Sequence, residues 1–135
     1  MIELAPRDFE TLKQLAELAY PEEFCAILLG ARQGVQVRVA RVMAVRNIHE
    51  RPRSAYAIEP KDLIVAQREA RERNLEIVGF VHSHPDHAAE PSVRDVELAH
   101  WPECVWGIVS VLSGVARAVR WFRIRDGVVA EDAVS

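Results

Sequence analysis

Two segments of the chain repeat apolar residues every three or four positions, which is the period of an amphipathic helix. The first covers residues 7–19 and is followed by Pro21. The second covers residues 61–73 and ends in basic residues, which favour the last turn of a helix. We therefore predict two helices at these positions.

Shorter apolar runs between turn residues have the length and the β-branched content of strands. Residues 24–29 and 35–45 are expected to pair around a turn over residues 30–34. Residues 75–81, with the sequence LEIVGFV, predict a buried strand that ends at His82. Three more strands, separated by SerGly and AspGly turn signals, are predicted at 104–112, at about 115–124 and at 128–130.

A short helix from Ser92 to about His100, stopped by Pro102, completes the order of elements. The order is helix, strands, helix, strand, helix, strands. It predicts an α/β fold in which helices flank a mixed β-sheet, a sandwich rather than a doubly wound Rossmann fold. With 135 residues, 50% of them hydrophobic, the chain is expected to form one domain over residues 1–135.

Charge and composition exclude several classes of function. The net charge of −3 excludes the strongly basic surface of a nucleic-acid-binding protein, and no polybasic block indicates membrane attachment. Because the first ten residues carry charges and no apolar run approaches the roughly 18 residues of a membrane span, we expect a cytoplasmic protein. Cys25 and Cys104 lack a CxxC spacing and are predicted to be buried, reduced thiols. No pattern specifies an oligomeric state.

The segment HSHPDHAAEPSVRD, residues 82–95, gathers side chains that bind metal ions. His82 and His84 stand two residues apart at the end of a predicted strand, so their imidazoles point to the same side. Asp95 is a third candidate ligand. Nitrogen and carboxylate ligands suit Zn²⁺, and three protein ligands leave one position open for water, as in catalytic zinc sites. Zinc lowers the pKa of such a water to about 7.

Hydrolysis at this site would also need a carboxylate base and a donor for the oxyanion. Ser92 is the candidate donor. The alternative for the same residues is structural, because SVRD is a helix-capping pattern with Ser92 as the cap and Asp95 at the third position. Two histidines on a strand can also simply be solvated. Asp86, His87 and Glu90 lie between the ligands and are expected to be solvated loop residues.

The complete arrangement, HxHP followed by six residues and then SxxD, resembles the motif of the JAMM (MPN+) zinc metalloproteases. In that family an upstream glutamate opens a short apolar strand that ends in glycine. The segment EFCAILLG, residues 23–30, is similar to this element. Without the resemblance, Glu22 and Glu23 would be interpreted as a solvated pair between a helix and a strand.

The resemblance implies a function for each of these residues and a fold for the chain. The fold would be the MPN/JAMM sandwich, which is similar to that of cytidine deaminases. One zinc ion would be bound by His82, His84 and Asp95. Glu23 would be the general base, and Ser92 would help to stabilise the tetrahedral intermediate.

The resemblance to the compact prokaryotic members also implies a substrate class. The resemblance implies that the substrate is a small ubiquitin-like or sulfur-carrier protein. It also implies that the protein hydrolyses a peptide or isopeptide bond after the carrier's C-terminal diglycine. The alternative is a non-catalytic MPN-type scaffold or assembly domain, against which the complete ligand set argues. A zinc nucleobase deaminase would need an HxE and a PCxxC segment, and neither occurs in the sequence.

Two further features bear on substrate contact. Residues 46–60 contain prolines and charged groups and predict a surface loop, the kind of segment that often contacts substrates. Arg46, Arg51 and Arg53 in this loop fit either an electrostatic contact with an acidic carrier or a loop that is only solvated. Trp101 is expected to be exposed.

Overall fold

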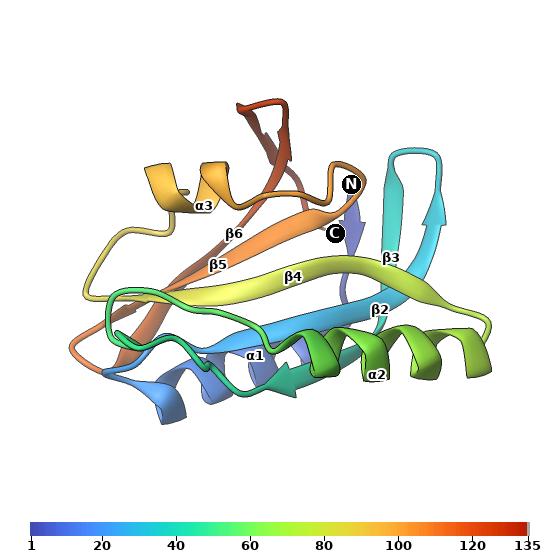
Figure 1. Cartoon of the computed structure of the whole chain (residues 1–135). Coiled ribbons are helices and arrows are strands. Elements are labelled where there is room, and N and C mark those ends of the chain that lie inside the picture. Colours follow the sequence, from blue (N-terminus) through green and yellow to red (C-terminus); the bar gives the residue numbers. More distant parts are fainter. Residues whose placement is uncertain (135) are drawn as a thin grey trace.

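The computed structural model describes residues 1–134, which form three helices and one seven-stranded sheet (Figure 1). In chain order the elements are β1 (Ile2–Glu3), α1 (Pro6–Ala19), β2 (Cys25–Gln33), β3 (Gln36–Val45), α2 (Pro60–Glu72), β4 (Glu76–Pro85), α3 (Val93–Glu97), β5 (Val105–Leu112), β6 (Val115–Arg125) and β7 (Val128–Asp132).

The strands follow the order β1-β3-β2-β4-β5-β6-β7 across the sheet. β1 pairs with β3 and β4 pairs with β5 in parallel, while the other neighbours are antiparallel. The predicted mixed sheet flanked by helices is therefore confirmed. The sheet curls so that its two edges meet. Ile2 forms a β-bridge with Val134, and the amide of Ile2 donates to the carbonyl of Ala133 at 2.8 Å.

Helices cover both faces of the sheet, so two hydrophobic cores form. Ala16 of α1 belongs to one core together with Val81 of β4. Phe80, the preceding residue of β4, belongs to the other core, which includes residues of α2. Because side chains alternate along a strand, His82 and His84 follow Phe80 on the α2 side. β4 thus carries the histidine pair through the interior of the molecule.

The two long helices lie where the apolar periodicity predicts them. Each begins one residue earlier than expected, at Pro6 and at Pro60. Proline is favoured at the first helical position because its missing N–H would have no partner there. None of the helices in residues 1–134 is both long and apolar enough to cross a membrane.

The predicted turn between the first two long strands is wrong in its extent. β2 pairs with β3 as far as Gln33, so that the turn is confined to Gly34 and Val35. Gly34 has a φ of 61°, which glycine adopts without strain. Gly30 lies inside β2 at a bulge, where an added Cβ would overlap the carbonyl oxygen of Arg38. The glycine therefore permits close approach of the strands instead of ending one.

Other features of the fold differ from prediction. β4 continues beyond His82 to Pro85, because its parallel pairing with β5 extends to that residue. The helix expected to reach His100 ends at Glu97. β1 was not predicted, since a two-residue strand is too short to show a periodic pattern.

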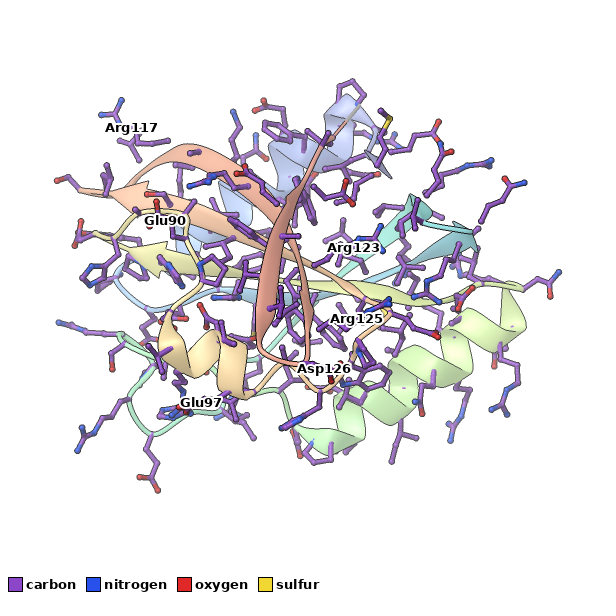
Figure 2. All side chains as sticks on the ribbon, turned by 90° about the horizontal axis from the view of Figure 1, so that it is seen from above. Glu90, Glu97, Arg117, Arg123, Arg125 and Asp126 are labelled. Carbon is purple, nitrogen blue, oxygen red and sulfur yellow. The ribbon has the colours of Figure 1, made fainter. Side chains whose placement is uncertain are left out.

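Ion pairs connect the last two strands, which also pair as an antiparallel ladder. Arg120 of β6 pairs with Glu131 of β7 at 2.6 Å and with Glu90 at 3.4 Å. Arg123 pairs with Asp132 at 3.0 Å. Figure 2 labels three arginines on β6 (Arg117, Arg123 and Arg125), Asp126 in the turn after it, and two glutamates around α3 (Glu90 and Glu97).

Candidate metal centre and active-site cavity

His82, His84 and Asp95 come together where the end of β4 meets the start of α3. The two Nε2 atoms are 3.1 Å apart. Oxygen atoms of Asp95 lie 3.2 Å from His82 Nε2 and 3.1 Å from His84 Nε2. Both histidines are buried. The three ligand atoms lie within 4.8 Å of one another, so the predicted ligands converge on one point.

This geometry fits a zinc ion. Ligand atoms at about 2.0–2.1 Å from a tetrahedral zinc are roughly 3.3 Å apart, close to the observed separations. Burial lowers the pKa of His82, which favours the neutral imidazole that metals bind. Burial acts to raise the pKa of Asp95, but hydrogen bonds to both histidines outweigh it and hold that pKa well below its usual range. The site thus offers two imidazoles and one carboxylate.

Glu23 lies two residues before β2 and lines the same cavity as His84 and Asp95. Its exposed fraction is 7%, whereas Glu22 is exposed. Burial raises the pKa of Glu23 to about 7, although the nearby charge of His84 opposes the shift. A carboxyl group with this pKa can both accept and release a proton near neutral pH. Of the two adjacent glutamates, only Glu23 has this environment.

Ser83 ties Glu23's segment to the histidine strand, and the sequence did not point to it. Its Oγ accepts a hydrogen bond from the amide of Phe24 at 2.7 Å, and its own amide donates to the carbonyl of Phe24 at 3.0 Å. Ser83 is fully buried and lies between His82 and His84 in sequence, on the opposite face of β4. The feature of the sequence that could have indicated this role is a serine within a predicted buried, apolar strand. These contacts fix Glu23 relative to His82 and His84.

Ser92 is the N-cap of α3, as the structural alternative predicted. Its Oγ accepts from the amide of Asp95 at 3.1 Å, and the Asp95 carboxylate accepts from the amide of Ser92 at 2.9 Å. The same carboxylate oxygen, Oδ2, also lies within hydrogen-bond distance of His84 Nε2. The capping box therefore orients the Asp95 carboxylate toward the histidines.

The site opens into a cavity of about 410 Å³. Residues 53–56 of the predicted surface loop form part of its lining, and the segment before α3, including His87 and Glu90, forms another part. Arg53 is the one predicted loop arginine that lines this cavity; Arg46 and Arg51 do not. The loop thus borders the candidate metal centre.

Asp86 lies in the loop between the candidate ligands His84 and Asp95, and its carboxylate binds residues outside the site. Its carboxylate accepts from the Tyr20 hydroxyl at 2.7 Å and from the amide of Ser113 at 2.8 Å. His87 and Glu90 are exposed. None of the three belongs to the ligand cluster.

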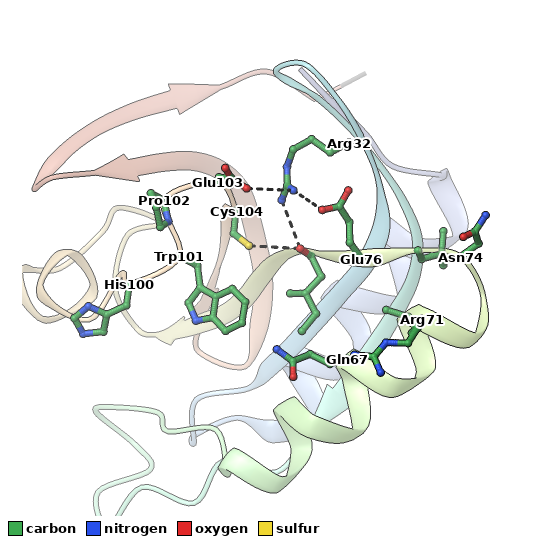
Figure 3. Close-up of a pocket in the computed structure, with 13 residues that line it drawn as sticks. Arg32, Gln67, Arg71, Asn74, Glu76, His100, Trp101, Pro102, Glu103 and Cys104 are labelled. Carbon is green, nitrogen blue, oxygen red and sulfur yellow. Dashed lines mark hydrogen bonds and ion pairs between the residues drawn. The ribbon is translucent and has the colours of Figure 1, made fainter.

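A larger cavity of about 660 Å³ lies at the other end of β4, between α2 and the segment before β5 (Figure 3). Arg32 in its wall is already paired with Glu76 at 2.6 Å and with Glu103 at 3.8 Å. Within residues 1–134, the only cluster of metal-binding side chains is the one at His82, not here. The candidate active site therefore lies at the smaller cavity and not at the larger one.

Trp101 lines the larger cavity, and the expectation that it is exposed is wrong. It is half-buried and packs edge-on against Phe80, with ring centroids 5.4 Å apart. After α3 ends at Glu97, the indole of Trp101 packs against the core that contains Phe80.

Residues 7–124 match the family described as prokaryotic homologues of the JAB domain. The matched segment includes all three candidate ligands as well as Glu23 and Ser92. The chain belongs to this family. The resemblance to JAMM (MPN+) proteins that the motif indicated is confirmed.

Relatives of this JAB domain include named hydrolases. A desampylase from Haloferax volcanii is 34% identical over 67% of this chain and 63% of its own length. A probable TtuB-protein conjugate cleaving protease from Thermus thermophilus is 33% identical over 64% of this chain and 57% of its own length. The chain therefore spans less than two thirds of these two relatives. A CysO-cysteine peptidase from Mycobacterium tuberculosis is 30% identical, over 86% of this chain and 77% of that protein.

Solved structures share the fold. A protein from Desulfitobacterium hafniense has a TM-score of 0.89 and 29% identity, covering 100% of this chain and 92% of the other. A JAB1/MPN domain protein from Archaeoglobus fulgidus has a TM-score of 0.59 and 21% identity, covering 98% of this chain and 96% of the other. The predicted MPN/JAMM sandwich is confirmed.

Proposed function

We propose that this chain, as one JAB domain over residues 1–135, is a zinc-dependent peptidase or isopeptidase. Its substrate would be the bond that follows the C-terminal diglycine of a small ubiquitin-like or sulfur-carrier protein. The observation that carries the proposal is the convergence of His82, His84 and Asp95 beside a cavity that is also lined by Glu23, whose pKa lies near neutrality. The relatives named desampylase, TtuB-protein conjugate cleaving protease and CysO-cysteine peptidase support the substrate class.

Each of these residues has a distinct part in the proposed hydrolysis. His82, His84 and Asp95 would hold the zinc ion. When bound, zinc supplies a Lewis acid that polarises the scissile carbonyl. Glu23 accepts one proton from the attacking water as the water oxygen bonds to the carbonyl carbon, and returns it to the nitrogen of the leaving amine as the C–N bond breaks.

Ser92 can cap α3 and stabilise the oxyanion at the same time. Its Oγ uses a lone pair to accept the amide of Asp95. The hydroxyl hydrogen is therefore left to donate, and Ser92 lines the cavity in which the oxyanion would form. We propose that the cap fixes the position of this donor.

The carrier's tail is proposed to bind in an extended conformation, because glycine admits close approach of another backbone. β4 pairs with β2 as far as His82 and with β5 as far as Pro85, so most of its length has no free edge. The tail would therefore lie along residues 53–56, the loop wall of the cavity.

We also propose that the protein acts in the cytoplasm. Cys25 and Cys104 are both free and buried, which supports a reducing compartment.

The test is cleavage of a diglycine carrier that is extended by one residue or a short peptide. The zinc-loaded protein is incubated with this carrier, and the carrier's intact mass is followed over time. We expect the mass of the extension to be lost with the wild type, but not with Glu23→Gln or His84→Ala. Glu22→Gln is the matched control and should cleave like the wild type.

Two outcomes would contradict the proposal. One is a wild type that releases nothing from any extended carrier, although it binds zinc stoichiometrically. The other is cleavage by Glu23→Gln at the wild-type rate. Failure to take up zinc would favour the non-catalytic scaffold.

A further inference from the structure

The two candidate histidine ligands are held in different ways. His84 Nδ1 is 2.9 Å from the carbonyl oxygen of Ala88. His82 Nδ1 is buried and has no hydrogen-bond partner among the described residues. Both rings present Nε2 to Asp95. When Nε2 binds a metal, the neutral ring carries its proton on Nδ1, so only His84 has an acceptor for that proton.

This difference matters for metal binding. A ligating histidine almost always donates its second N–H to an acceptor, which fixes the orientation of the ring. His84 satisfies this rule through a main-chain carbonyl. His82 does not, and another contact must hold the plane of its imidazole.

Tyr56 makes that contact. Its ring stacks on the imidazole of His82, with centroids 4.5 Å apart and an angle of 22° between the planes. Such offset stacking prefers one relative orientation of the two rings. Tyr56 lies in the irregular segment between β3 and α2, so no helix or strand positions it.

The side chain of Asn47 holds the segment on both sides of Tyr56. Its Nδ2 donates to the carbonyl of Ala55 at 3.0 Å, and its Oδ1 accepts from the amide of Ala57 at 3.1 Å. The same Nδ2 also donates to the carbonyl of Glu23 at 3.1 Å. One amide group therefore connects the stacking residue to the candidate base.

We propose that Tyr56 is a positioning residue for the metal centre, whose ring fixes the plane of the His82 imidazole, and that Asn47 holds Tyr56 in register with Glu23. This inference rests on the zinc-binding part of the proposed function and not on cleavage. Removing the aromatic face should let the His82 ring rotate and weaken zinc binding. Removing only the hydroxyl should not.

The test compares Tyr56→Leu with Tyr56→Phe. Zinc affinity is measured by competition with a chromogenic chelator, and the visible absorption of the cobalt-substituted protein reports the ligand geometry. We expect Tyr56→Leu to lose about 10- to 100-fold in affinity, the range seen when the group that orients a ligand is removed. Its cobalt spectrum should change, whereas Tyr56→Phe should match the wild type in both measurements.

Two controls keep the comparison informative. Thermal unfolding in the presence of chelator shows whether each metal-free variant is folded, and Tyr56→Met, with an adaptable side chain, replaces Tyr56→Leu if the latter is not. Asn47→Ala should weaken zinc binding in the same direction, because it releases the segment that carries Tyr56. Full zinc affinity in the folded non-aromatic variant, or an equal loss in Tyr56→Phe, would overturn the proposal.

The inference and the proposed function fail in different ways. Zinc binding that depends on the ring of Tyr56, in a protein that cleaves no carrier, would support the positioning role and contradict the peptidase. Cleavage that persists with unchanged zinc affinity in Tyr56→Leu would do the reverse.

Discussion

A carboxyl group that is buried on folding holds its proton more tightly, and Glu23 is in this position. Its pKa rises from an ordinary value of 4.5 to about 7 in the folded protein. Between these pH values the folded state keeps a proton that the unfolded state has released. The free energy of unfolding should therefore fall as pH rises through this window. The residue best placed to act as the base is also a cost to stability at neutral pH.

We predict that Glu23→Gln stabilises the metal-free protein at pH 8, by up to about 3 kcal/mol, because a neutral amide does not have to lose a proton. Near pH 4.5, where the carboxyl is protonated, the gain should largely vanish. Urea unfolding at several pH values, with chelator present, measures the difference. Glu22→Gln, at an exposed position, should show no such trend, and a gain for Glu23→Gln that does not depend on pH would contradict the account.

Individual side chains differ in how far the sequence could assign them. His82, His84 and Asp95 stand in a motif with fixed spacing, so their convergence could be predicted. The choice of Glu23 over Glu22 depended on a family resemblance, because both are charged residues at one junction. Tyr56 could not be found in this way, because its contact with His82 depends on how a loop without periodicity folds back over β4.

The helix α3 is short, and its capping box couples its start to Asp95, a candidate metal ligand. Three substitutions at Ser92 separate capping from catalysis. Threonine keeps both the acceptor and the donor, aspartate keeps the cap but has no hydroxyl to donate, and alanine removes both. We predict that kcat falls by about 10²- to 10³-fold in Ser92→Asp and Ser92→Ala, but only slightly in Ser92→Thr.

Stability should follow a different order in the same series. Ser92→Ala should lose about 0.5–2 kcal/mol of unfolding free energy, while Ser92→Asp stays close to the wild type. Carrier cleavage and urea unfolding of all three variants provide the measurements. Wild-type kcat in Ser92→Asp would show that the hydroxyl only caps the helix.

At the level of elements, the periodic patterns of the sequence predicted the helices. Strand ends that depend on hydrogen bonds to a neighbouring strand were missed. Both long helices have several turns of apolar periodicity and were placed to within a residue. The turn near Gly30 was placed too early, because the end of an apolar run need not end a strand. Hydrogen bonds to β3 continue as far as Gln33, where the residues are polar or partly exposed.

Across the whole molecule, zinc binding should raise the temperature of unfolding. A ligand that binds only the folded state stabilises it by about 2.7 kcal/mol at roughly 100 times its dissociation constant. For a domain of this size that corresponds to a Tm increase of roughly 10 °C. We expect this increase in calorimetry of the wild type, with reversal by chelator.

His84→Ala is the control for this prediction, because it removes one ligand at the partly open side of the centre. It should show little increase in Tm at the same zinc concentration. An equal increase in both proteins would indicate that zinc binds elsewhere.

The closure of the sheet between Ile2 and Ala133 has a consequence for how the molecule opens. This contact encloses almost the entire chain in one loop, so forming it costs more conformational entropy than any hairpin in the sheet. Few residues form the contact between the two edges of the sheet. We expect this contact to open locally while the central strands stay paired. Ile2 aligns through Val37 with Arg32, at the end of β2 remote from the Cys25 and His82 pair. We therefore expect these contacts to open before the candidate metal centre is disturbed.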